Sequence, residues 1–141
     1  MSEAITLTYN VSPDDFTRAG EASRDVKNKL KQLGISPVAI RKVAIAMYEG
    51  EINMVIHAKG GKITVDISPE SIRMVLADVG PGIPDIELAM REGYSTAPES
   101  VRSLGFGAGM GLSNMKKYTD YMDIQTVLGM GTTITMIVNA A

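Results

Sequence analysis

Three polar residues in the segment 48–58, YEGEINMVIHA, are spaced so that one side of a helix would carry all of them. Glu49, Asn53 and His57 follow one another at intervals of four residues, which is close to one helical turn. A carboxylate one turn before a carboxamide would combine a proton acceptor with an oxygen ligand for a metal ion. Residues from elsewhere in the chain must complete such a site.

Asp78 is one residue that could complete it. It precedes the loop 79–84, VGPGIP, in which Gly80 and Gly82 are the glycines. An aspartate before such a loop is often only a turn former. At the end of a buried strand, however, its carboxylate could accept a hydrogen bond from an exocyclic amine, as in adenine. Both interpretations stay open from this residue alone.

A glycine-rich segment at 105–111, GFGAGMG, could supply further contacts. Its alternating glycines free the backbone to turn amide groups toward a ligand, and a helix that begins there adds a positive dipole end. Phosphate is the natural ligand. The spacing matches neither a P-loop, because Leu112 and Ser113 follow Gly111, nor a dinucleotide loop, because Met110 stands at its last glycine. The segment alone fits a flexible connection equally well.

The elements that position these residues follow from periodicity and from helix start and stop signals. A serine-proline pair predicts a first helix over about 13–33 with Gly34 as its stop, and a second pair predicts a helix over about 37–58. The second helix has an apolar stripe beside its polar line, formed by Val43, Met47, Gly50 and Met54.

The remaining segments predict mostly strands joined by short turns. We expect strands at 5–11, 62–67, 72–77, 121–127 and 132–138, helices at 85–91 and 109–118, and an irregular polar stretch at 92–103. This order excludes a doubly wound fold, which needs strict alternation of strands and helices. It favours an α/β (α+β) protein, a two-layer sandwich with a mixed, mostly antiparallel sheet and the helices on one face.

Length and composition predict one globular domain. The chain has 141 residues, 45% hydrophobic content, a net charge of −2 and no cysteine. Because it has neither a leader-like start nor about 18 consecutive apolar residues, we expect a cytoplasmic protein with no membrane segment. Seven bases face two acids between residues 18 and 42, and we expect a solvated helix face there rather than a surface for an acidic partner. No direct contact with nucleic acid is expected.

Four short motifs occur in the order in which one superfamily carries them. They are Glu-x-x-x-Asn at 49–53, Asp-x-Gly-x-Gly at 78–82, the glycines at 105–111 and Gly-Thr-Thr at 131–133. Together they resemble the ATP-binding motifs of the GHKL superfamily, which includes gyrase, Hsp90, MutL and histidine-kinase ATPase domains. Four motifs in order are far more specific than any one of them.

The small size of the chain and the run YSTAPESVRSLG at 94–105 narrow this resemblance. They resemble the bacterial anti-sigma factor serine/threonine kinases and the related switch kinases. The resemblance implies a Bergerat ATP-binding fold over 1–141, with a lid at about 92–111, and the cofactors ATP and Mg²⁺.

The resemblance also implies a role for each matching residue. Glu49 is the base that accepts the proton of the substrate hydroxyl, Asn53 is the Mg²⁺ ligand, Asp78 contacts adenine, and Arg102 in the lid reaches the γ-phosphate. The other nucleotide-binding positions implied are Gly80, Gly82, Ile83, Gly105, Gly107, Gly109, Met110, Gly111, Leu112 and Thr133. These roles suit phosphoryl transfer, which depends on positioning and on neutralising charge. From the residues alone, Arg102 fits a solvated loop position equally well.

The activity implied is that of a protein serine/threonine kinase that is an anti-sigma factor or a partner-switching regulator. Its substrate would be a STAS-domain antagonist, its competing partner a sigma factor, and its state a homodimer. Two alternatives remain: a module that binds ATP and sequesters a partner without phosphotransfer, and an ATPase domain like that of a histidine kinase. The second is disfavoured, because the chain has no phosphoacceptor helix pair and its one histidine lies beside the first motif.

Two further polar residues of the second helix are expected to lie outside the site. Glu51 should point about 160–200° away from Glu49 and be exposed to solvent. His57, at the C-terminal end of the helix, is expected to be a capping or otherwise satisfied histidine.

Overall fold

The computed structural model describes residues 5–12, 18–90 and 111–140. Strand β1 covers Ile5–Val11, and two long helices follow, α1 (Glu21–Gln32) and α2 (Pro37–His57). The later elements are β2 (Gly61–Ile67), β3 (Ser71–Asp78), the short helix α3 (Ile86–Ala89), α5 (Gly111–Lys117), β4 (Tyr121–Val127) and β5 (Gly131–Asn139). All the described strands and helices lie within two to three residues of the expected ones, except for the start of α1.

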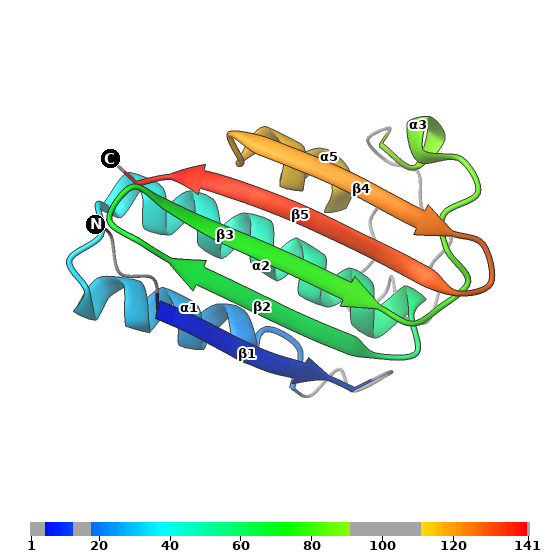
Figure 1. Ribbon diagram of the computed structural model, residues 1–141, viewed down its shortest axis with the longest axis horizontal. Coiled ribbons are helices and arrows are strands. Elements are labelled where there is room, and N and C mark those ends of the chain that lie inside the picture. Colours follow the sequence, from blue (N-terminus) through cyan, green and yellow to red (C-terminus); the bar gives the residue numbers. More distant parts are fainter. Residues whose placement is uncertain (1–4, 13–17, 91–110, 141) are drawn as a thin grey trace.

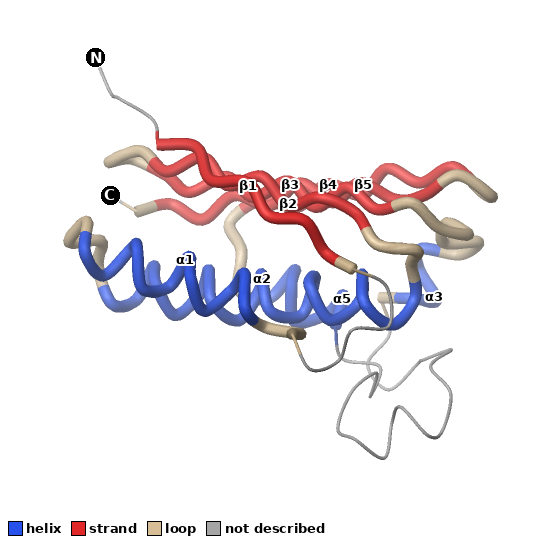
Figure 2. The backbone as a smooth tube through the Cα atoms, turned by 90° about the horizontal axis from the view of Figure 1, so that it is seen from below, coloured by secondary structure: helices blue, strands red, loops and turns tan. Residues whose placement is uncertain are grey.

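The five strands form one sheet in the order β1-β2-β3-β5-β4, and every neighbouring pair is antiparallel. The helices α1, α2 and α5 cover one face of this sheet, so the molecule has two layers (Figure 2). The predicted sandwich with helices on one face is therefore confirmed, and the sheet is antiparallel throughout. Figure 1 shows α2 running behind the central strands, with α1 behind β1 and β2 and α5 behind β4 and β5.

The core lies between the two layers and follows the period-two alternation of the strands. Along β5, for example, Thr132, Ile134, Met136 and Val138 are buried, while the residues between them are less so. The predicted apolar stripe of α2 is confirmed, since Val43, Met47, Gly50 and Met54 are all buried. The polar line of Glu49 and Asn53 therefore lies at the edge of the core.

Helix α2 starts and packs as its sequence predicts. The Ser36 side chain caps it by accepting a hydrogen bond from the backbone N–H of Ala39 at 3.3 Å, and Pro37 occupies the first turn. Gly50 lets the helix approach the sheet closely. A Cβ at this position would lie only 2.3 Å from Leu76 Cδ2 on β3.

The predicted start of the first helix is wrong. The helix begins at Glu21 and not near residue 13, because Gly20 has a left-handed backbone with φ 94° and interrupts the helical path. Ser12 lies well before this start, and 13–17 lie outside the described residues. The predicted stop is confirmed, because Gly34 has a φ of 76° just after the helix.

No helix among the described residues is both long enough and apolar enough to cross a membrane.

Candidate functional site

The polar edge of α2 faces helix α5. The Nδ2 atom of Asn114 lies 3.5 Å from Glu49 Oε1, and one turn further along α2 the carboxamide of Asn53 lies against the Cα of Gly111. All four residues are partly buried. The structure thus brings the first predicted motif, at 49–53, to the end of the third, at Gly111.

A side chain at Gly111 would displace the Asn53 carboxamide from its present position. A Cβ there would lie 2.9 Å from Asn53 Nδ2 and 3.1 Å from Asn53 Oδ1, which is closer than such atoms normally pack. Leu112, the next residue, turns the other way and is buried in the core. The side chain of Leu112 is therefore a packing residue, and only its backbone could serve a ligand.

Asp78 lies at the end of β3, beside the C-terminal part of α2. A Cβ on Gly61 would lie 2.6 Å from Met54 Cε and 2.8 Å from Asp78 Cα, so the strand end and the helix are in close contact. Asp78 Oδ1 accepts a hydrogen bond from the backbone N–H of Thr132 at 2.9 Å. Among the described residues this is its one donor, which leaves Oδ2 for an exocyclic amine.

The surroundings of Asp78 also affect its protonation. Partial burial raises the pKa of this carboxyl group, and the hydrogen bond from the Thr132 amide partly opposes the rise. A half-buried carboxylate that accepts only one hydrogen bond from the described residues favours a ligand that brings a donor.

The loop after Asp78 is fixed to the turn between β4 and β5. The backbone N–H of Gly80 donates to the Met130 carbonyl at 3.1 Å, and that of Ile83 donates to Thr126 Oγ1 at 2.8 Å. Gly82 has a φ of 80°, and a Cβ there would lie 2.9 Å from the same Thr126 hydroxyl. The amides of Gly80 and Ile83 thus have protein partners, so these residues shape the loop beside Asp78.

The structure does not bring the Thr133 side chain to Asp78. Thr132 is buried on the helix-covered face of the sheet, so Thr133, the next residue on β5, faces the opposite side. Thr132 Oγ1 lies 3.0 Å from Thr126 Oγ1 and shares the face with Asp78. The expectation for Thr133 therefore needs correction, and the apolar alternation at 134, 136 and 138 was the signal that favoured Thr132.

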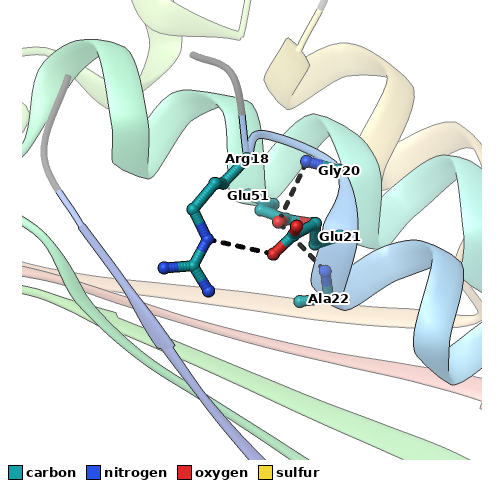
Figure 3. A network of polar contacts seen from close by, with 5 residues as sticks. All are labelled: Arg18, Gly20, Glu21, Ala22 and Glu51. Atoms are coloured by element: carbon teal, nitrogen blue, oxygen red, sulfur yellow. Dashed lines mark hydrogen bonds and ion pairs between the residues drawn. The ribbon is translucent and has the colours of Figure 1, made fainter. Parts of the chain in front are cut away.

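The expected exposure of Glu51 is wrong. Its side chain points away from Glu49, as the helical geometry predicts, but α1 covers that side and only 3% of the residue is exposed. Its carboxylate accepts hydrogen bonds from the backbone N–H groups of Gly20 (3.0 Å), Ala22 (3.2 Å) and Ser23 (3.0 Å), and from Ser23 Oγ (2.7 Å). Figure 3 shows this carboxylate at the start of α1.

Glu51 thereby acts as the cap of α1. Gly20 precedes that helix and has no side chain to accept from its first amides. A carboxylate from α2 takes that place and also suits the positive end of the helix dipole. In the same region, the exposed Arg18 pairs with Glu21 at 3.1 Å (Figure 3).

Several predicted residues lie outside the described part of the chain. They are Arg102, Gly105, Gly107, Gly109 and Met110, and their proposed roles stay predictions. His57 is the last residue of α2, as expected from the sequence.

Sequence reasoning missed Asn114 and Thr126. Asn114 was open to detection, because it lies three residues after Gly111 and so on the same face of α5.

The described residues do not form a metal site from protein ligands alone. No group of three or more His, Cys, Asp or Glu side chains comes together among them. Asn53 offers a single carboxamide oxygen at the polar edge of α2. This fits Mg²⁺ in nucleotide sites, which is usually held by one or two protein ligands together with phosphate oxygens and water.

Fold and site together define a class of protein: a two-layer sandwich whose candidate site residues lie where α2 contacts α5 and where α2 contacts the end of β3. A family model described as Histidine kinase-, DNA gyrase B-, and HSP90-like ATPase matches residues 40–141. The chain belongs to this family, and the predicted resemblance to the GHKL superfamily is confirmed.

Two curated relatives are similar over most of their length. The chain is 31% identical over 115 residues to the serine/threonine-protein kinase RsbT of Bacillus subtilis (strain 168). The alignment covers 79% of this chain and 80% of RsbT. It is 34% identical over 102 residues to the anti-sigma F factor of Thermoanaerobacter sp. (strain X514). This alignment covers 69% of this chain and 68% of that anti-sigma factor.

A solved structure has the same fold. The crystal structure of the RsbU and RsbW domains of Rv1364c from Mycobacterium tuberculosis aligns with a TM-score of 0.62 and 18% sequence identity. The alignment covers 95% of this chain but only 31% of that longer one. It therefore supports the fold of the whole described chain.

Proposed function

We propose that this chain is an ATP-dependent protein serine/threonine kinase that acts as an anti-sigma factor or partner-switching regulator. The observation that carries the proposal is that Glu49 and Asn53 on α2 meet Asn114 and Gly111 on α5, while Asp78 ends β3 against the same helix. This combination offers a proton acceptor and a metal ligand on α2 and an adenine contact at the adjoining end of β3. Family membership and relatives named as a kinase and as anti-sigma factors support it.

Each residue has a defined part in the proposed transfer. Glu49 takes the proton from a serine or threonine hydroxyl of the substrate, whose oxygen bonds to the γ-phosphorus as ADP leaves. Asn53 offers its carboxamide oxygen to the metal ion, and Asp78 Oδ2 accepts from the amino group of adenine. Bound ATP would supply the phosphoryl group, and Mg²⁺ would neutralise its charge. Arg102 would add a positive charge from the lid.

The proposed substrate is a STAS-domain antagonist protein, with a sigma factor as the competing partner and a homodimer as the oligomeric state. The names of the relatives support partner switching, since RsbT is named a kinase and the Thermoanaerobacter relative an anti-sigma factor. The STAS-domain substrate and the homodimer follow only from the family resemblance. Sizing of the purified protein by multi-angle light scattering tests the dimer directly.

The central experiment incubates the protein with Mg-ATP and each STAS-domain protein of its host. Phosphate is then sought on a serine or threonine of the partner by mass spectrometry. Glu49→Ala should retain ATP binding but lose about 10²- to 10⁴-fold in transfer rate, the usual contribution of a general base. Asn53→Ala should lose Mg²⁺-dependent nucleotide binding.

The same experiment separates the kinase from a sequestering module. Binding of both ATP and partner with no transfer of phosphate, even at enzyme concentrations equal to the substrate, would leave only the module. Transfer by Glu49→Ala at the wild-type rate would remove Glu49 as the base while retaining the kinase.

A further inference from the structure

The side chains of Glu49 and Asn114 meet across the interface between α2 and α5. Glu49 Oε1 lies 3.5 Å from Asn114 Nδ2, and Asn53 contacts Gly111 one turn away. Glu49 and Asn53 are four residues apart on α2, and Gly111 and Asn114 are three residues apart on α5. Each pair therefore lies on successive turns of one helix face. The interface therefore has two adjacent polar contacts, one at each residue of the 49–53 motif.

Packing beside these contacts fixes the distance between the helices. Met115, next to Asn114, is fully buried, and its Sδ lies 3.4 Å from where a Cβ on Gly50 would be. Gly50 in turn follows Glu49 directly. The apolar pair holds α5 close to α2, so Asn114 remains within reach of Glu49.

The chemistry of the two groups determines how they bind. A carboxylate only accepts hydrogen bonds, whereas a carboxamide has both an accepting oxygen and a donating NH₂ group. The NH₂ group of Asn114 therefore faces Glu49. Asn114 contacts Oε1 and is the one hydrogen-bond donor to Glu49 among the described residues, so within this part of the chain Oε2 is open to another donor.

We propose that Asn114 is a positioning residue for Glu49 and that it holds the carboxylate for proton transfer. This inference rests on the proposed kinase function. A glutamate has three rotatable side-chain bonds, and a base works only within about 2.6–3.2 Å of the proton donor atom. By occupying Oε1, Asn114 restricts the carboxylate to one orientation and directs Oε2 toward the substrate hydroxyl. A contact of 3.5 Å can shorten when the reactants bind, as catalytic hydrogen bonds commonly do.

The activity test uses two replacements of similar size. Asn114→Leu removes the donor, and Asn114→Asp places a second carboxylate against Glu49. Transfer from Mg-ATP to the STAS-domain protein identified above should fall about 10-fold in kcat for the first and further for the second, with KM for ATP within about 2-fold. Lys116→Ala, an exposed position on the same helix, is the matched control. A rise in KM with kcat unchanged would overturn the positioning role.

A double-mutant cycle tests whether Asn114 acts through Glu49. Adding Asn114→Leu to Glu49→Gln should cause no further loss of kcat, because the group that Asn114 positions is already absent. An equal 10-fold loss in both backgrounds would overturn the inference.

An observation that is independent of activity completes the test. The side-chain NH₂ signals of Asn114, assigned by their loss in Asn114→Leu, should shift in the ¹⁵N NMR spectrum of Glu49→Gln. Unchanged signals would show that the contact is absent and would overturn the inference even in an active kinase. Shifted signals in a protein that transfers no phosphate would retain the contact but reject the proposed function, and the positioning role with it.

Discussion

Two acidic residues, Glu49 and Glu51, lie two positions apart on α2 and have opposite surroundings. Glu49 lies at a partly exposed edge of α2 beside α5. Glu51 is enclosed by α1 and accepts four hydrogen bonds, three of them from backbone amides. The same side-chain chemistry thus serves a candidate base at one position and a helix cap at the other.

Glu51→Ala should destabilise the fold without touching the proposed nucleotide site. Loss of this acceptor leaves buried donors at the start of α1 without a partner, and we expect the free energy of unfolding to fall by about 2–3 kcal/mol. Urea denaturation followed by circular dichroism measures the change. Glu87→Ala on α3, an exposed acid, is the control and should change stability by less than about 0.5 kcal/mol. Equal stability of the two variants would contradict the capping role.

Asp78→Asn should separate stability from binding. Burial raises the pKa of Asp78, so the folded protein disfavours its charged form. The wild-type carboxyl group of Asp78 therefore makes its full contribution to stability at acidic pH, and this contribution is lost as the pH rises through the raised pKa. The neutral variant should be more stable than wild type at pH 7, and the difference should vanish at low pH. Melting temperatures measured from pH 3 to 8 check this dependence.

The same variant should bind nucleotide more weakly. A hydrogen bond between an amino group and a carboxylate contributes about 1.5–3 kcal/mol, so adenine affinity should fall about 10- to 100-fold. Isothermal titration with ATP, and with GTP as the control for base recognition, measures the loss. An unchanged affinity for ATP would exclude Asp78 as the adenine contact.

At the scale of elements, the position of α2 determines the geometry of the site. The helix contacts β3 through Gly50, where Leu76 leaves no room for a side chain, and contacts α5 through Met115. The polar residues on either side of Gly50 therefore have fixed distances to the sheet and to α5. A small change in the height of α2 above the sheet would move Glu49 and Asn53 together.

Gly50→Ala should destabilise the protein, although alanine is the better helix former by about 1 kcal/mol. The added Cβ would overlap Leu76, and overpacking of this kind typically costs about 1–3 kcal/mol. Urea denaturation gives the change in the free energy of unfolding. Leu76→Ala alone should also destabilise by leaving a cavity, but the double variant should lose less than the two single losses together. Strict additivity would contradict the proposed overlap.

For the whole molecule, nucleotide should stabilise both layers at once, because the proposed site joins α2, α5 and the end of β3. A ligand at about 100 times its Kd adds about 2.7 kcal/mol to the free energy of unfolding. Mg-ADP at that level should raise the melting temperature by on the order of 5–10 °C. Asn53→Ala should abolish most of this rise, whereas Lys62→Ala, on the uncovered face of the sheet, should retain it. A rise of equal size in both variants would place nucleotide elsewhere.

The sequence alone determined the order of the elements and most of their ends. Cap residues, stop glycines and the two hydrophobic periods act over only a few neighbours, so Ser36, Gly34 and the alternation in β5 were informative without knowledge of the fold. The motifs also singled out Glu49, Asn53 and Asp78, whose functional roles stay predictions. The predicted start of α1 was wrong because it used the local signal at Ser12. The cap of that helix instead comes from Glu51, 31 residues after Gly20.

Only the tertiary structure decided what each side chain contacts. Three such contacts involve residues from different helices. Glu51 is buried against α1, Asn114 contacts Glu49, and Asn53 packs against Gly111. A helical period gives the direction in which a side chain points but not the element that covers that side. The packing of α1 and α5 against α2 supplies that information, and it distinguishes the two acids of α2.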